Sequence, residues 1–162
     1  MRTIVAVNAD WGIGHDGKQP VALPEDRKFF KEMTTGGVII AGRKTFEDFP
    51  SGALPNRKNI ILTKDKTFYA DGITILHSIE EVLAEVSAED PEKVFVAGGG
   101  TVYEQFLPYC DCAFVTKLQA MPPSDTYFAN LDELDNWSLE CEISSGDSSG
   151  IKYTVCLYKQ DI

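Results

Sequence analysis

The chain has 162 residues, of which 43% are hydrophobic and 25% charged, and its 25 acidic and 15 basic residues give a net charge of −10. This length is sufficient for one domain with a complete core, so we expect a single domain over residues 1–162. The acidity argues against nucleic acid or an anionic membrane as a partner. No segment approaches the roughly 20 apolar residues of a membrane span. The N-terminus lacks a secretory signal pattern, so we expect a cytoplasmic protein.

Cysteine and histidine content limits the chemistry available to the chain. Cysteines occur at four positions without a C-x-x-C pair: Cys110, Cys112, Cys141 and Cys156. With only two histidines beside them, we expect reduced structural thiols and no metal site. Neither histidine neighbours a serine or cysteine nucleophile motif, so a hydrolytic triad is not predicted.

Strands and helices alternate through the first two thirds of the chain. Short apolar runs predict buried strands at 3–9, 37–42, 59–63, 73–76 and 93–100. Helical patterns predict helices at 24–34 and 44–49 and two more that begin at Ser78 and Thr101. Glu81 follows Ser78 at the spacing of a capping box. Such alternation predicts an α/β domain with a mainly parallel sheet.

The last third of the sequence has a different pattern. Further strands are predicted at 112–120, 137–144 and 151–160, and no helix separates the last two. The segment SSGDSSG, residues 144–150, predicts a turn-rich connection between them. The whole sequence therefore predicts a mixed, mainly parallel central sheet of about eight strands, flanked by four helices, with a C-terminal antiparallel hairpin.

The segment VALPEDRKFFKEM, residues 21–33, places two acids directly after a proline. Proline and carboxylates are favoured in the first helical turn, so both acids fit an ordinary helix start. At about 100° per residue, Asp26 falls within the apolar arc of this helix, whereas Glu25 points along the polar side. That arc consists of Phe29, Phe30 and Met33. Burial of a carboxylate costs free energy unless the charge is paired or hydrogen-bonded. Asp26 therefore has one of three roles: it takes part in catalysis, it caps a loop, or it pairs with a buried arginine.

Two strand-to-helix junctions offer sites for phosphate groups. In VIIAGRKTF, a strand ends at Gly42 and a helix begins with arginine, lysine and threonine; in VFVAGGGTVYEQF, three glycines separate strand and helix. Glycine lets the backbone approach a ligand, and a helix start offers free amides to anions. Each junction alone also fits simple turn chemistry, and neither has the spacing of a P-loop or a G-x-G-x-x-G motif. Together they favour a nucleotide diphosphate.

Basic residues flank the strand in LPNRKNIILTK. Such charges usually solvate a surface. In an acidic protein, Arg57 is also suited to a ligand carboxylate, and Thr63 with Lys64 to a phosphate.

The order and spacing of LPEDRKFF, GRKTFE, PNRKNIIL and GGGTVYEQFLP resemble the dihydrofolate reductase family of bacterial type. The segment IVAVNADWGIGHDGKQP is similar to its first strand and mobile loop, and SDTYF at 124–128 to a late motif, so the match covers almost the whole chain. The resemblance implies a monomer that uses NADPH to reduce 7,8-dihydrofolate to tetrahydrofolate for one-carbon metabolism.

The resemblance also implies roles for particular residues. Asp26 is the catalytic acid of the pterin pocket with Thr116 as its neighbour, Phe30 packs near the pterin, and Arg57 binds the glutamate tail. The other substrate-binding residues implied are Val5, Ala6, Arg27, Phe49, Leu54, Ala97 and Tyr103. The cofactor-binding residues implied are Ala6, Ile13, Gly14, Gly42, Arg43, Lys44, Thr45, Leu62, Thr63, Lys64, Gly98, Gly99, Gly100, Thr101, Val102 and Gln105.

Four positions depart from the usual family pattern. Val21 stands where a tryptophan usually helps to order a water near the pterin, which puts the proton route in doubt. Gln19 replaces a loop methionine of many bacterial members, and Arg27, at a usually apolar position, contacts the tail or turns to solvent. Thr101 replaces a basic residue, so preference for NADPH over NADH rests on Arg43 and the Thr63–Lys64 pair.

Two other functions fit parts of this pattern. The pyrimidine reductases of riboflavin synthesis share the expected fold and a glycine-rich cofactor loop, but need neither Asp26 nor Arg57 as placed here. A module that binds NADPH and folate with little turnover is the other alternative, because Val21 replaces the tryptophan.

Overall fold

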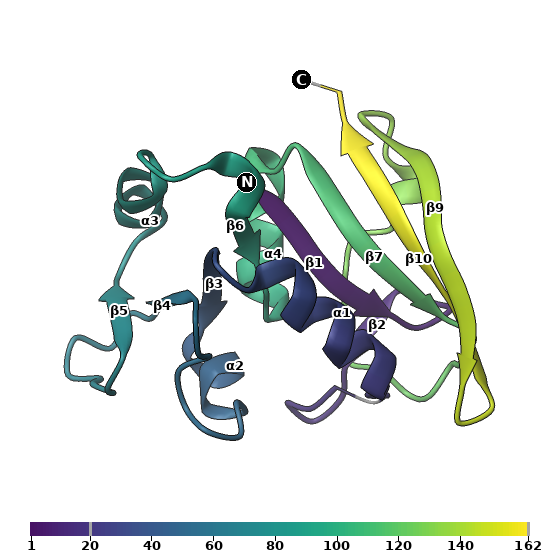
Figure 1. Cartoon of the computed structure of the whole chain (residues 1–162), viewed down its shortest axis with the longest axis horizontal. Helices are drawn as coiled ribbons and strands as arrows, with labels where there is room; N and C mark the ends of the chain where they lie inside the picture. The colour runs from purple at the N-terminus through teal and green to yellow at the C-terminus, as the bar shows by residue number, and fades with distance from the viewer. Residues whose placement is uncertain (20, 162) are drawn as a thin grey trace.

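The computed structural model describes residues 1–19 and 21–161 (Figure 1). The strands of its main sheet are β1 (Arg2–Val7), β3 (Val38–Gly42), β4 (Lys58–Leu62), β5 (Ile73–Leu76), β6 (Val94–Val96), β7 (Cys112–Leu118), β9 (Trp137–Ser148) and β10 (Ile151–Gln160). They lie in the order β5-β4-β3-β6-β1-β7-β10-β9. The pairs from β5 to β7 are parallel, and β10 is antiparallel to both of its neighbours.

The connecting helices are α1 (Pro24–Thr34), α2 (Arg43–Glu47), α3 (Ile79–Val86) and α4 (Gly100–Phe106). Short 3-10 turns occur at Pro91–Lys93, Leu107–Tyr109 and Leu131–Glu133. Two further short strands, β2 (Gly12–Gly14) and β8 (Thr126–Tyr127), pair with each other outside the main sheet. The mixed, mainly parallel sheet, its helices and the C-terminal hairpin predicted from the sequence are therefore confirmed.

Side-chain alternation along the strands assigns the helices to the two faces of the sheet. In β1, Ile4 joins the cluster that packs against Phe29 and Phe30 of α1, whereas Val5 and Val7 join the opposite cluster. That opposite cluster contains the apolar side chains of α3 and α4. Because adjacent residues of a strand point to opposite faces, a run such as TIVAV can be buried on both sides. The sheet is consequently covered by α1 on one face and by α3 and α4 on the other (Figure 1).

Two expected connections differ from the structure. The strand expected at 93–100 is only β6, since the glycines that follow it leave the ladder. The turn expected at 144–150 is also too long, because β9 continues to Ser148 in register with Ile151 of β10. Only Ser149 and Gly150 form the turn, with φ of 52° and 82°. Positive φ at both central residues is the geometry that two-residue hairpins prefer, which explains why the polar run remains in the strand.

Across residues 1–19 and 21–161, no helix has both the length and the apolar character needed to cross a membrane. The same residues contain no group of three or more histidine, cysteine or acidic side chains arranged to hold a metal ion. The four cysteines are free, three of them buried and Cys141 exposed.

Candidate active site

Asp26 lies in the first turn of α1 and is partly buried against the sheet. Its carboxyl lies close to the hydroxyl of Thr116 of β7. Burial raises the pKa of the Asp26 carboxyl because desolvation penalises its ionised form, and the nearby Thr116 hydroxyl opposes this only partly. The side chain is thus an acid whose protonated form persists to higher pH than that of an exposed aspartate.

The partners of Asp26 are fixed by the sheet. Thr116 is only 2% exposed and pairs with Ala6 across the parallel β1–β7 ladder. Tyr103 of α4 donates a hydrogen bond from its hydroxyl to the carbonyl of Ile4 at 2.8 Å, and burial together with the nearby Asp26 charge raises its pKa. A phenol with a raised pKa stays neutral, so Asp26 is the group that titrates here.

The apolar arc of α1 packs as its periodicity predicts. Phe29, Phe30 and Met33 cover the cluster of Ile4, Phe95, Cys112 and Phe114. The rings of Phe29 and Phe114 meet edge to face at 6.2 Å between centroids. This packing fixes the helix that carries Asp26 and places an aromatic side chain one turn away from the acid.

Arg57 is connected to the C-terminal end of the same helix. Its Nε donates to the carbonyl of Pro55 at 3.0 Å and its Nη1 donates to Thr34 Oγ1 at 3.1 Å. The Thr34 hydroxyl in turn donates to the carbonyl of Phe30 at 2.7 Å. Burial lowers the pKa of the Arg57 guanidinium, although an arginine remains charged at neutral pH. The helix therefore has an acid at its beginning and a fixed cation at its end.

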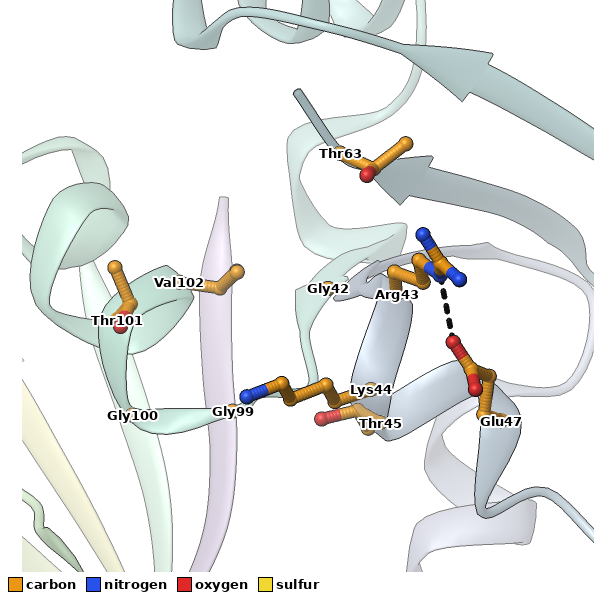
Figure 2. A pocket seen from close by; sticks show the side chains of 10 residues that line it. All are labelled: Gly42, Arg43, Lys44, Thr45, Glu47, Thr63, Gly99, Gly100, Thr101 and Val102. Atoms are coloured by element: carbon orange, nitrogen blue, oxygen red, sulfur yellow. Dashed lines mark hydrogen bonds and ion pairs between the residues drawn. The ribbon is translucent and has the colours of Figure 1, made fainter. Parts of the chain in front are cut away.

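A cavity of about 550 Å³ lies between the two glycine junctions identified in the sequence (Figure 2). Its lining residues are Gly42, Arg43, Lys44, Thr45, Glu47, Thr63, Gly99, Gly100, Thr101 and Val102. The backbone N–H of Gly42 donates to the carbonyl of Gly98 at 2.8 Å, so the junctions are joined directly. Cationic and hydroxyl side chains dominate the polar part of this lining, a combination suited to phosphate groups.

Two glycines of the second junction, Gly98 and Gly100, have a steric reason to be glycine. A Cβ on Gly100 would lie 2.6 Å from Thr126 Cγ2 of β8. Gly98 has a φ of 111°, and a Cβ there would lie 3.1 Å from the Tyr103 ring. Side chains at these positions are excluded by neighbouring protein atoms, so both glycines are required for the close packing of this junction.

Comparison with known proteins places this geometry in a family. The family description "Dihydrofolate reductase" matches residues 1–160. The chain is 40% identical over 136 residues to the dihydrofolate reductase of Bacillus subtilis, covering 84% of this chain and 79% of the relative. The chain belongs to the dihydrofolate reductase family.

Further dihydrofolate reductases agree with this assignment. The enzyme of Staphylococcus haemolyticus is 39% identical over 139 residues, which cover 85% of this chain and 82% of the relative. The solved structure of dihydrofolate reductase from Enterococcus faecalis, complexed with NADP(H) and RAB-propyl, superposes with a TM-score of 0.88 at 32% identity. That superposition covers 99% of this chain and 96% of the other. The alternative of a pyrimidine reductase receives no support from these matches.

The resemblance to dihydrofolate reductases implies sixteen cofactor-binding residues, and the structure brings most of them together. Nine of the sixteen line the cavity described above. The others are Ala6, Ile13, Gly14, Leu62, Lys64, Gly98 and Gln105. Lys64 and Gln105 are exposed, whereas Ile13 is near the cavity, since its Cδ1 would lie 3.9 Å from a Cβ on Gly100.

The residues that the resemblance implies for the substrate are likewise only partly brought together. Val5, Ala6 and Thr116 occupy adjoining parallel strands. Arg27 is exposed, and Phe49 packs edge to face on Phe46 at 5.9 Å, in a cluster separate from the one under α1. The side chain of buried Asn59 forms two hydrogen bonds with the backbone of Leu54. The Leu54 N–H donates to Asn59 Oδ1 at 2.8 Å, and Asn59 Nδ2 donates to the Leu54 carbonyl at 2.9 Å.

Three acidic residues have contacts that the sequence did not predict. Glu47 and Asp65 both accept hydrogen bonds from Arg43, at 2.7 and 2.8 Å. The spacing of Arg43 and Glu47, four residues apart on a helix, was the available signal for the first contact. Glu25 is exposed as expected, but it also accepts a hydrogen bond from the hydroxyl of buried Ser148. It therefore connects α1 to the β9–β10 hairpin in addition to favouring the helix start.

Proposed function

We propose that this chain catalyses the NADPH-dependent reduction of 7,8-dihydrofolate to 5,6,7,8-tetrahydrofolate and so serves one-carbon metabolism. The observation that carries the proposal is the partly buried carboxyl of Asp26, which lies on the apolar side of α1 beside Thr116. One acid with a raised pKa is the machinery that this reduction requires, since a nitrogen must gain a proton when its neighbouring carbon is reduced.

Asp26 has two tasks in this proposal. It binds the amidine edge of the pterin, and in its protonated form it promotes protonation of N5 through water. NADPH supplies the hydride that C6 of the pterin receives. Thr116 positions the carboxyl, and Tyr103, whose hydroxyl is committed to the Ile4 carbonyl, closes the pocket without competing for the proton.

The remaining substrate contacts follow the length of α1. Phe30 packs on the pterin and aminobenzoyl groups, and Arg57 binds the glutamate carboxylate with the N–H groups that it does not donate to Pro55 and Thr34. Val5, Ala6 and Ala97 border the position where the nicotinamide meets the pterin. Arg57 suits this role because a guanidinium can bind both carboxylate oxygens at once.

The residues of the cavity fit the adenosine and diphosphate parts of NADPH. Arg43, Lys44 and Thr63 offer positive charge and a hydroxyl on one side, and Gly99, Gly100 and Thr101 border the other. At Gly99 and Gly100 only backbone borders the cavity, so a diphosphate can approach the chain closely there. Ile13 and Gly14 belong to the segment that closes over the nicotinamide in this proposal.

Val21 leaves the water route to N5 without the ordering that the usual tryptophan provides. We expect a lower rate of the chemical step as a result, with binding of both ligands retained. A module that binds both ligands with little turnover is the extreme of this effect.

We infer in addition that residues 1–162 act as a single-domain, cytoplasmic monomer without nucleic-acid or membrane partners. The net charge of −10 supports the absence of polyanionic partners. Four free cysteines, three of them buried, are consistent with a reducing compartment.

The test is the loss of NADPH absorbance when dihydrofolate is added, repeated with NADH and across pH. Rapid loss that depends on dihydrofolate, with a pH profile that Asp26→Asn removes, is the expected result. Binding of both ligands without turnover would overturn the proposed activity in favour of the binding module.

A further inference from the structure

The guanidinium of Arg43 is already occupied by protein carboxylates at the edge of the cavity. Its Nε donates to Glu47 Oε1 at 2.7 Å, a contact visible in Figure 2, and its Nη1 donates to Asp65 Oδ2 at 2.8 Å. The ring of Phe68 lies 4.8 Å from the guanidinium carbon. Arg43 is therefore held in place from three sides.

Asp65 is itself held rigidly toward Arg43. Its Oδ1 accepts hydrogen bonds from the backbone N–H and the hydroxyl of Thr67, at 2.9 and 2.6 Å. Its own backbone N–H donates to Thr63 Oγ1 at 3.1 Å. The Thr67 hydrogen bonds, followed by the Arg43 charge, lower the pKa of Asp65, so the carboxylate is ionised at neutral pH.

Charge is unevenly distributed along the cavity. In Figure 2, Arg43 extends toward Thr63, whereas Lys44 extends toward Gly99. At the Arg43 end, Glu47 and Asp65 place two negative charges against one positive charge. Lys64 is exposed and does not line the cavity. A phosphate at the Arg43 end must therefore compete with Asp65 for the guanidinium.

We propose that Asp65 is a specificity-determining residue that weakens the preference for NADPH over NADH by retaining Arg43. This inference rests on the proposed function of the cavity as the cofactor site. A 2′-phosphate at the Arg43 end is repelled by the Asp65 carboxylate and must compete with it for the guanidinium, whereas NADH has no 2′-phosphate and meets neither cost. Asp65 thus lowers the affinity for NADPH relative to that for NADH.

The test is to measure the dissociation constants of NADPH and NADH by fluorescence for the unmodified chain and for Asp65→Asn. Asparagine keeps the shape and the acceptor for Thr67 but removes the charge beside Arg43. The ratio of NADPH to NADH affinity should rise about tenfold, the order expected for removing one charge within a few ångströms of a phosphate. Adenosine 2′,5′-bisphosphate should gain affinity relative to adenosine 5′-monophosphate by a similar factor.

Two control variants isolate the Arg43 contact. Glu89→Gln also removes one negative charge, but Glu89 Oε1 lies 3.9 Å from Lys58 Nζ, whereas Arg43 pairs with Glu47 and Asp65, so the ratio should be unchanged. In an Arg43→Ala background, Asp65→Asn should raise the ratio by less than it does when Arg43 is present. An unchanged ratio in Asp65→Asn, with both dinucleotides bound, would overturn this inference alone. Failure of the unmodified chain to bind either dinucleotide would overturn the proposed function as well.

Discussion

Burial determines the behaviour of single side chains in this site. Asp26 and Glu25 are neighbours in the same helical turn, yet burial raises the pKa of Asp26, and the Ser148 hydrogen bond lowers that of exposed Glu25. The pKa values of two adjacent carboxyls are consequently shifted in opposite directions. Only the carboxyl on the apolar side keeps its proton to higher pH than an ordinary aspartate.

The Asp26→Asn variant tests whether the buried carboxyl, and not its exposed neighbour, supplies the proton. The variant should lose activity by roughly 100-fold to 10,000-fold near neutral pH, the usual contribution of a general acid, while NADPH affinity stays unchanged. The unmodified enzyme should slow as pH rises through the raised pKa of Asp26, and the variant should show no such step. Single-turnover absorbance measurements across pH provide the check.

Stability gives an independent test of the same substitution. A raised pKa means that the folded state binds the proton more tightly than the unfolded state, so the Asp26 contribution to stability decreases as pH rises above the ordinary aspartate value. Asp26→Asn should therefore unfold at higher denaturant concentration than the unmodified chain at pH 7, with the difference disappearing in acid. A variant that is less stable than the unmodified chain at pH 7 would contradict the inference that burial of the ionised Asp26 carboxyl destabilises the fold.

Arg57→Ala should weaken dihydrofolate binding with little change in NADPH binding. A hydrogen-bonded charge contributes about 2 kcal/mol, so KM for dihydrofolate should rise roughly 30-fold. Dihydropteroate, which lacks the glutamate, is the matched control because it should bind the variant and the unmodified chain alike. An equal loss for both substrates would remove Arg57 from the tail site.

At the scale of elements, the cavity between the two glycine junctions is bordered by a close approach of α4 to β8. A Cβ on Gly100 would meet Thr126 Cγ2 at 2.6 Å, and neither the helix start nor the paired strand can easily move away. The absence of a side chain at Gly100 is thus a requirement of packing between α4 and β8, through two residues that lie 26 positions apart in the chain.

Gly100→Ala should destabilise the fold by about 1–3 kcal/mol through overpacking and should weaken NADPH binding. Thr126→Ser removes the methyl group that the new Cβ would meet, so the double variant should recover most of the loss. Thr126→Ser alone should remain close to the unmodified chain. Denaturant unfolding and NADPH titration of all four proteins measure the coupling, and an unrescued double variant would contradict the contact.

For the whole molecule, a ligand held between α2 and α4 should stabilise the complete fold. Free NADPH at 100 times its dissociation constant should add about 2.7 kcal/mol to the free energy of unfolding. For a chain of this length, the melting temperature should rise by roughly 5–10 °C. Thermal unfolding with and without NADPH measures this rise, and adenosine without phosphates serves as the control. No rise at saturating NADPH would exclude the cavity as the cofactor site.

Sequence by itself determined the elements that depend on local pattern. The period of α1 correctly placed Asp26 with its phenylalanines, the apolar runs located the strands, and the ordered motifs identified the family. These features are encoded within one helix, one strand or one junction, so neighbouring residues suffice to reveal them.

Tertiary structure alone decided which distant side chains meet. The hydrogen bond from Ser148 to Glu25, the occupation of Arg43 by Asp65 and the exclusion of a side chain at Gly100 by Thr126 each join separate elements. The continuation of β9 to Ser148 likewise depended on its register with β10. Polar residues are compatible with a turn, a surface or an ion pair, and only the packing of the sheet selects the partner that fixes their role.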